Sequence, residues 1–143
     1  MADERRRVLI VCMGNSCRSQ MAEVVWRALG GERWEVVSAG TRPKGVDPRT
    51  LAVLQERGYP TTGLRSKHVS EVAAGSFDLV VTVCDSAREE CPVWPNAGQV
   101  LHWPFPDPAA ADGTDEEQLE LFRAVLELIE DRIRSYLKQV DES

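Results

Sequence analysis

The stretch that decides the fold is Val8-Leu9-Ile10-Val11-Cys12-Met13-Gly14-Asn15-Ser16-Cys17-Arg18-Ser19. It joins a short apolar run to a Cys-x5-Arg-Ser loop, and the residues that follow have the periodicity of an amphipathic helix. Successive backbone N–H groups in a tight turn at a helix N-terminus point at an anion, and the helix dipole adds positive charge. The pattern therefore predicts a strand, an anion-binding loop and a helix in direct succession.

This loop places a nucleophile in front of the anion. Arg18 offers a planar, bidentate donor to a tetrahedral oxyanion. The same field favours the thiolate form of Cys12, and the Ser19 hydroxyl is placed to donate to that sulfur. We expect the oxyanion to be bound by Met13, Gly14, Asn15, Ser16, Cys17, Arg18 and Ser19. The alternative is that Cys12 is only a small apolar residue buried at a strand end.

Four apolar runs predict the strands of a single sheet, with helical patterns between and after them. The runs are Arg7–Cys12, Glu35–Ser38, Asp78–Val83 and Gln99–His102. Alternation of strands and helices predicts an α/β fold of three layers, with a four-stranded parallel sheet flanked by helices. We expect one domain over residues 1–143, with the active site at the carboxyl ends of the strands.

Two helix starts are visible in the sequence. Asp47 is a candidate N-cap with Pro48 in the first helical position, and Gly58 closes that helix. We expect its Leu51 and Leu54 to face the sheet. A capping box at Thr114-Asp115-Glu116-Glu117 begins the last helix, whose predicted core stripe is Leu119, Phe122, Leu126, Ile129, Ile133 and Tyr136.

Composition limits the classes of function. A chain of 143 residues, 43% hydrophobic and 28% charged, is large enough for one core. A net charge of −6 and a pI near 5.0 argue against nucleic acid or an anionic membrane as partner. The N-terminus precedes only a strand-length apolar run, so we expect no secretory signal, no membrane span and a cytoplasmic protein. The absence of an obvious self-complementary apolar patch favours a monomer.

A second cysteine pair follows the third predicted strand. Cys84 ends that strand and Cys91 comes seven residues later, just before Pro92. In a regular helix their Cα atoms would be about 10 Å apart, whereas a disulfide needs roughly 7 Å or less. The pair can therefore bridge only if the segment unwinds, and we predict a redox-gated loop there. Reduced cysteines in a cytosolic chain point to catalysis, redox cycling or metal binding.

Two other interpretations of the cysteines stay open. Cys84 can be a buried strand-end residue and Cys91 an incidental thiol. Alternatively, Cys12, Cys17 and this pair form a four-thiolate zinc site, although structural zinc sites usually have tighter spacing and Arg18 would crowd a cation. We expect no metal and no cofactor.

The segment after the fourth predicted strand carries a candidate acid. Its sequence is His102-Trp103-Pro104-Phe105-Pro106-Asp107-Pro108, on the same side of the sheet as Cys12. Thiolate attack on a tetrahedral oxyanion expels an oxygen, which Asp107 is placed to protonate. The alternative is an Asx cap before Ala109. We assign His102 and Trp103 to the wall and packing of the site.

Together these segments resemble the low-molecular-weight protein tyrosine phosphatase superfamily, and more closely its thioredoxin-coupled arsenate reductases. The resemblance rests on residues 12–23, Ser38-Ala39-Gly40-Thr41, Cys84 with Cys91-Pro92, and the run from His102 to Ala109. Phosphatases of the superfamily share the anion loop and the Asp-Pro pair. The Cys84/Cys91 pair is what resembles the reductases.

The resemblance implies reduction of arsenate to arsenite, and hence arsenic detoxification. It implies that Cys12 attacks arsenate held by the loop amides and Arg18, while Asp107 protonates the departing oxygen. It further implies that Cys84 attacks Cys12, that Cys91 then attacks Cys84, and that thioredoxin reduces the resulting Cys84–Cys91 disulfide. An internal disulfide suits a dithiol reductant better than glutaredoxin with glutathione.

Some reductases of this kind bind a structural potassium ion near residues that match Asn15, Glu23 and Ser38. The Thr and Asp ligands that some members add are replaced here by Arg65 and Lys67. We therefore hypothesise that the Lys67 ammonium pairs with Glu23 in place of the ion.

The sequence leaves three functions open. The first is arsenate reduction, and the second is a phosphatase acting on phosphotyrosine-like or small aryl phosphates, with phosphate or sulfate as analogues. The third is a non-catalytic redox sensor. Cys17 has no required chemical step in either enzyme, so we assign it to loop packing or to an off-pathway reaction with Cys12.

Overall fold

The predicted parallel sheet is present in the computed structural model, which describes residues 5–72, 76–83, 97–110 and 112–142. Its strands are β1 (Arg6–Cys12), β2 (Trp34–Gly40), β3 (Phe77–Thr82) and β4 (Ala97–His102). All neighbours are parallel, in the order β2-β1-β3-β4. The β2 strand is longer than predicted because it pairs with β1 along the whole length of both strands, from Trp34 beside Arg6 to Gly40 beside Cys12.

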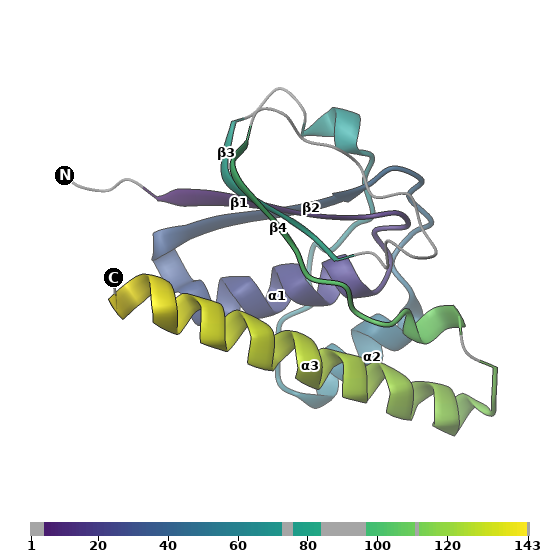
Figure 1. Ribbon diagram of the computed structural model, residues 1–143. Coiled ribbons are helices and arrows are strands. Elements are labelled where there is room, and N and C mark those ends of the chain that lie inside the picture. Colours follow the sequence, from purple (N-terminus) through teal and green to yellow (C-terminus); the bar gives the residue numbers. More distant parts are fainter. Residues whose placement is uncertain (1–4, 73–75, 84–96, 111, 143) are drawn as a thin grey trace.

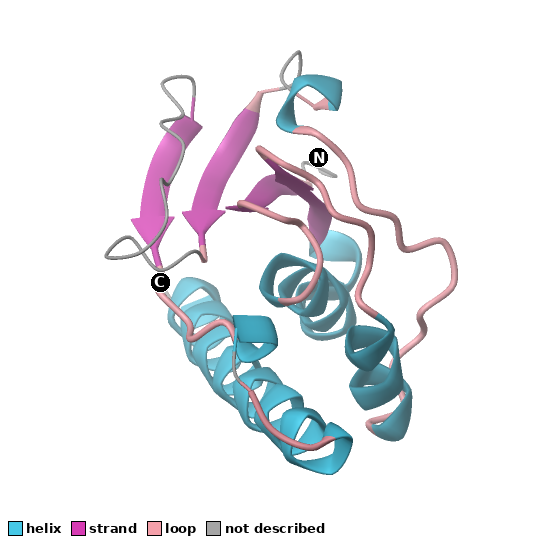
Figure 2. Ribbon diagram, turned by 90° about the vertical axis from the view of Figure 1, so that its right-hand side faces the viewer, coloured by secondary structure: helices cyan, strands magenta, loops and turns pink. Residues whose placement is uncertain are grey.

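The α-helices of the described residues lie together on one face of the sheet (Figures 1 and 2). They are α1 (Arg18–Gly30), α2 (Pro48–Glu56) and α3 (Asp115–Glu142). Three short 3₁₀ turns complete the described elements: η1 (Gly31–Arg33), η2 (Val69–Glu71) and η3 (Pro108–Ala110). The η2 turn covers the opposite face of the sheet (Figure 1).

The central strand β1 is buried on both faces, which explains its unbroken apolar sequence. Val8 and Ile10 belong to the large core under the helices. Leu9 and Val11 belong to a smaller cluster on the other face, against which Val69 of η2 packs. Because side chains alternate along a strand, these two sets fix which way Cys12 points: toward the helices, at the end of the larger core.

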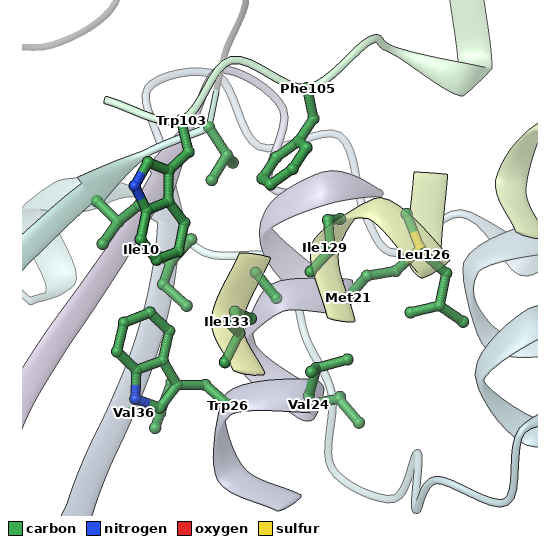
Figure 3. Close-up of a cluster of buried hydrophobic side chains, with 14 of the residues drawn as sticks. Ile10, Met21, Val24, Trp26, Val36, Trp103, Phe105, Leu126, Ile129 and Ile133 are labelled. Carbon is green, nitrogen blue, oxygen red and sulfur yellow. The ribbon is translucent and has the colours of Figure 1, made fainter. Parts of the chain in front are cut away.

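The larger core joins the three α-helices to the sheet. Figure 3 shows Ile10 of β1, Met21 and Trp26 of α1, and Ile129 and Ile133 of α3 meeting in this cluster. Every one of these residues is fully buried. The face of α3 that the apolar stripe predicted is therefore the packed face.

Aromatic packing anchors the segment that follows β4. The Trp103 ring stacks on Trp26 with the centroids 5.9 Å apart, and it meets Tyr136 edge-on at 5.6 Å. Trp103 is only 5% exposed, as expected for a packing residue. This contact holds the chain in place four residues before Asp107.

Both predicted helix starts are confirmed. The Asp47 carboxylate accepts a hydrogen bond from the Arg49 amide at 2.8 Å, with Pro48 in the first position of α2, and Gly58 has a left-handed φ of 83°. The Thr114 hydroxyl accepts from the Glu117 amide at 3.1 Å, and the Glu117 carboxylate accepts from the Thr114 amide at 3.0 Å. In the described part of the chain no helix is long and apolar enough to span a membrane.

The expected orientation of α2 is wrong. We predicted that Leu51 and Leu54 face the sheet, but α2 packs on α3 and α1, and its buried apolar residues are Val53 and Leu54. Leu51 is only half buried. The spacing of apolar residues identifies the buried face of a helix, but not the element that covers it.

Candidate functional site

Three segments meet around one cavity at the carboxyl ends of the strands. It has a volume of ≈ 190 Å³ and is lined by Cys12, Met13, Gly14, Ser16, Cys17, Arg18, Lys44, Asp47, Asp107 and Ala109. The loop between β1 and α1 forms its base, and the segments after β2 and β4 form its walls. This is where a parallel α/β sheet is expected to bind a ligand.

Two groups able to donate hydrogen bonds lie at the sulfur of Cys12, a residue that is 2% exposed. The Asn15 amide donates to Sγ at 3.3 Å, and the Ser19 Oγ lies 3.0 Å from the same atom. The Asn15 side chain donates to Ser19 Oγ at 2.8 Å, which leaves the hydroxyl hydrogen free to point at the sulfur. The loop is thus built to stabilise negative charge on Cys12, as a sulfur nucleophile requires.

Asn15 shapes the turn of the loop from beneath. It is fully buried and has a left-handed φ of 46°, a conformation that Asn tolerates better than most residues. Its Nδ2 also donates to Ser38 Oγ at 2.9 Å, and its Oδ1 accepts from the Lys67 amide at 2.9 Å. Asn15 and Ser19, two of the predicted oxyanion-binding residues, do not line the cavity; their side chains position the loop and Cys12.

A buried acid lies behind Asn15. Ser38 donates to Glu23 Oε1 at 2.6 Å, and Glu23 is also paired with Arg27 at 2.8 Å and with the Lys67 ammonium at 3.8 Å. Burial lowers the pKa of Lys67, and the charge of Glu23 opposes that effect. The pairing of Lys67 with Glu23 that we hypothesised from the sequence is thus present, whereas the replacement of a potassium ion by Lys67 stays a prediction.

Arg18 links the anion loop to the candidate acid. Its side chain is 5% exposed and donates to the Phe105 carbonyl at 3.1 Å. Its Nη2 lies 3.8 Å from Asp107 Oδ2. A guanidinium held in place by its neighbours is a preorganised donor for an oxyanion in the cavity.

Asp107 forms an Asx turn and also lines the cavity. Its Oδ1 accepts from the Ala109 amide at 3.0 Å, which is the Asx turn of the alternative interpretation. That turn fixes the carboxyl group at the cavity, with Oδ2 toward Arg18 and one third of the side chain exposed. A carboxyl group here is placed to exchange a proton with a leaving oxygen above Cys12.

The second cysteine of the loop is held as a thiol. The pKa of Cys17 is raised to about 11, chiefly by burial and also by the nearby charge of Asp47, whereas a hydrogen bond with Ser16 opposes the shift. Its Sγ donates to Ser16 Oγ at 3.7 Å. Cys17 therefore fits the packing role that we assigned to it.

The predicted redox pair, Cys84 and Cys91, lies outside the described residues. The same holds for the four-thiolate zinc interpretation, which requires both. Among the residues that are described, no group of three or more His, Cys, Asp or Glu side chains is arranged to hold a metal ion.

The two histidines have structural contacts away from the cavity. The His68 ring accepts from the Ser70 amide at 3.0 Å and caps η2. The His102 ring lies 2.7 Å from Thr82 Oγ1 and is exposed. His102 therefore does not form the wall of the cavity that we expected of it.

Sequence reasoning missed Lys44 and, as a cavity residue, Asp47. The Lys44 amide donates to the Gly14 carbonyl at 3.0 Å, and the Asp47 amide donates to the Ser16 carbonyl at 3.2 Å. The Arg49 side chain holds the pKa of Asp47 below its usual value by hydrogen bonding. Their position in the chain could have identified them: both residues follow β2, the strand beside β1, and so lie at the same edge of the sheet as the anion loop.

Comparison with known proteins gives a family and a set of relatives. Residues 7–143 match the family described as low molecular weight phosphotyrosine protein phosphatase. A protein of Halalkalibacterium halodurans named arsenate reductase is 39% identical over 132 residues, which is 92% of this chain and 95% of the relative.

Solved structures agree with this family. One, described as an arsenate reductase in the phosphate binding state, superposes with a TM-score of 0.79 at 30% identity and covers 94% of this chain and 98% of its own. A thioredoxin-dependent arsenate reductase of Corynebacterium glutamicum has a TM-score of 0.75 at 26% identity, covering 99% of this chain and 64% of its own. The likeness thus includes sequence and fold over nearly the whole chain.

Proposed function

Because the chain belongs to the low molecular weight phosphotyrosine protein phosphatase family, we propose that it is an arsenate reductase that uses Cys12 as its nucleophile. The observation that carries the proposal is the Cys12 sulfur at the base of a small cavity, hydrogen-bonded by the Asn15 amide and the Ser19 hydroxyl and with Arg18 at the cavity wall. Relatives named arsenate reductase support the choice of substrate. Phosphate and sulfate should bind as unreactive analogues.

The first step forms a covalent adduct. The Cys12 thiolate attacks arsenic while the loop amides and Arg18 hold the other oxygens, as positioned donors do for developing negative charge. The bond from arsenic to one oxygen breaks, and Asp107 supplies the proton with which that oxygen leaves as water. Arsenic is still As(V) in this thiol adduct.

The second step is the reduction, and it uses the cysteines at 84 and 91. The Cys84 thiolate attacks Cys12 Sγ, a sulfur–sulfur bond forms, and the electron pair of the arsenic–sulfur bond stays with arsenic, which leaves as arsenite, As(III). The Cys91 thiolate then attacks Cys84 and releases Cys12 as a thiolate. The two electrons given to arsenic leave a Cys84–Cys91 disulfide.

We assign the return of those electrons to thioredoxin. A dithiol reductant exchanges with an internal disulfide through one mixed disulfide, and it leaves both cysteines reduced. The thioredoxin-dependent relative of Corynebacterium glutamicum supports the assignment. A relay that must begin with free thiols belongs in a reducing compartment, which places the protein in the cytoplasm in this proposal.

The test is arsenate-dependent NADPH oxidation in the presence of thioredoxin and thioredoxin reductase. The wild type should sustain turnover, Cys12→Ser should show none, and Cys91→Ser should stop after one arsenite per enzyme. Full activity of Cys12→Ser would overturn every step. Sustained turnover by Cys91→Ser would overturn the relay and leave the nucleophile intact.

A second candidate function is that of a phosphatase. Cys12, Arg18 and Asp107 line one cavity and would suffice for phosphoryl transfer without the second cysteine pair. In that case water releases the phosphoenzyme, so Cys84→Ser and Cys91→Ser should leave hydrolysis of aryl phosphates unchanged. Aryl phosphate hydrolysis in a wild type that reduces no arsenate would favour this function.

A further inference from the structure

We propose that Lys44 is a specificity-determining residue of the anion site. Its ammonium interacts with the oxygen of a free tetrahedral oxyanion that faces the mouth of the cavity, opposite Cys12. The chemical class that it selects is the unesterified oxyanion, such as arsenate or phosphate. For arsenate the inference rests on the proposed function, whereas for phosphate it is a statement about binding alone.

The backbone fixes Lys44 against the anion loop. Its amide donates to the Gly14 carbonyl at 3.0 Å, and two residues earlier the Arg42 amide donates to the Met13 carbonyl at 2.8 Å. The segment after β2 is thus hydrogen-bonded to two consecutive carbonyls of the loop. The start of the Lys44 side chain therefore cannot move away from the cavity without breaking these bonds.

The stem of the side chain lies directly on Gly14. A Cβ atom built on Gly14 would lie 3.3 Å from Lys44 Cδ and 3.4 Å from Cγ and Cε. Three successive methylene groups therefore fill the space that a larger residue at position 14 would occupy. The side chain continues from there along the wall of the cavity, which it lines together with Cys12 and Arg18.

The charge of Lys44 is available to a ligand. Within the described residues no carboxylate lies within 4.0 Å of its ammonium, whereas Asp47, the other charged residue from this segment at the cavity, is bound by Arg49 through two bonds of 3.0 and 2.8 Å. Lys44 is exposed, so its ammonium reaches the mouth without the cost of burying a charge. Among the described residues that line the cavity the cations are Arg18, which we place at the inner oxygens, and Lys44, which remains for the outer one.

This placement separates free oxyanions from esters. Attack by Cys12 requires the leaving oxygen to lie opposite the sulfur, toward the mouth. In arsenate or phosphate that oxygen shares the negative charge, but in an aryl phosphate it is an ester oxygen with little charge. The attraction to Lys44 is therefore greater for the free oxyanion.

The experiment compares binding of inorganic phosphate and of phenylphosphonate by calorimetry. Phenylphosphonate keeps the three inner oxygens and has carbon where the outer oxygen would be. Lys44→Met keeps the packing on Gly14 and removes the charge, and it should weaken phosphate binding about tenfold and phenylphosphonate binding less than twofold. Lys44→Arg should restore most of the phosphate affinity.

Arg42→Met is the matched control, because Arg42 is an exposed cation of the same segment whose side chain does not line the cavity. It should change neither affinity by more than twofold. The inference would be overturned if Lys44→Met lost as much affinity for phenylphosphonate as for phosphate, or if its phosphate affinity were unchanged. It would also be overturned if Arg42→Met lost as much phosphate affinity as Lys44→Met, because the effect of Lys44 would then be general electrostatics. A wild type that reduces no arsenate refutes the proposed function and leaves this comparison valid.

Discussion

Ser19 Oγ lies 3.0 Å from Cys12 Sγ, and it accepts a hydrogen bond from Asn15 Nδ2 at 2.8 Å. The Asn15 amide donates to the same sulfur at 3.3 Å. Asn15 therefore both donates to the Cys12 sulfur and binds the hydroxyl that lies beside that sulfur. We therefore expect the reactivity of Cys12 to depend on the shape of the loop as well as on the charge of Arg18.

Ser19→Ala should lower the reactivity of Cys12 while the fold is retained. The variant removes one donor to the thiolate and leaves Asn15 with its bond to Ser38. A hydrogen bond to a charged group contributes about 1.5–3 kcal/mol, so we expect turnover to fall by a factor of about 10–100. Alkylation of Cys12 by iodoacetamide at pH 7 should slow in parallel. Unchanged alkylation would show that Ser19 accepts from a Cys12 thiol instead of donating to a thiolate.

Asp107→Asn should separate chemistry from binding. The amide keeps its acceptor for the Ala109 N–H, so the Asx turn survives, but it has no proton to give to the departing oxygen. We expect kcat to fall by about 10²–10⁴, the usual contribution of a general acid, with phosphate affinity within a few-fold of the wild type. A loss of affinity as large as the loss of kcat would assign Asp107 to binding.

We expect the protein to lose stability at alkaline pH because of Cys17. Its pKa is raised from 9.0 to about 11, so the folded state holds this proton more tightly than the unfolded state does. The stabilisation is complete below pH 9 and is lost as the pH rises toward 11, by up to about 3 kcal/mol. This loss of stability is measured by denaturant unfolding of the wild type and of Cys17→Ser across this pH range, with a thiol reductant present.

The difference between the two proteins isolates Cys17, because Tyr59, whose pKa is also raised, is common to both. Their stability difference should change between pH 8 and pH 11. Arsenate turnover should survive in Cys17→Ser, because Cys17 has no chemical step. Parallel stability curves would mean that the thiol is not protonated preferentially in the folded state.

Gly40→Ala should distort the anion loop. A Cβ atom at position 40 would lie 2.5 Å from the Met13 carbonyl oxygen and 3.0 Å from both the amide nitrogen and Cβ of Asn15. The contact with the Met13 oxygen is too close for any side chain and the other two are tight, so the loop must shift, at a cost of about 1–3 kcal/mol. Melting temperature and phosphate affinity should both fall. Thr41→Ala, one residue later, should change neither appreciably.

Lys67→Met should destabilise the protein, since it leaves the buried Glu23 with Arg27 as its only cation in the described network. We expect a loss of about 2 kcal/mol, because removing one partner leaves a buried charge undercompensated. Arg65→Met is the control, as it breaks an exposed pair with Glu71 and should cost far less.

Since Lys67 already supplies the positive charge, potassium and sodium should give the wild type equal activity and melting temperature. A higher value in potassium would refute the replacement of the ion by Lys67.

The features that the sequence predicted correctly depend on interactions between residues that are close together in the chain. The apolar run of β1, the loop from Cys12 to Arg18 and the capping box at Thr114 involve residues within a few positions of one another. Their geometry follows from turn chemistry, capping and side-chain periodicity. The position of Asp107 was also predictable, because the carboxyl ends of parallel strands share one edge of the sheet.

The sequence by itself therefore determined the order of the strands and helices along the chain and the loop from Cys12 to Arg18 between β1 and α1. The tertiary structure alone decided which strands are neighbours, that α2 packs on other helices, that Gly40 must lack a side chain because it abuts Met13, and that Lys44 lies over Gly14. The physical reason is the separation along the chain between the residues that make these contacts. Contacts between segments that are far apart in the chain depend on how the whole core packs, and no local pattern of residues encodes the distance between two loops.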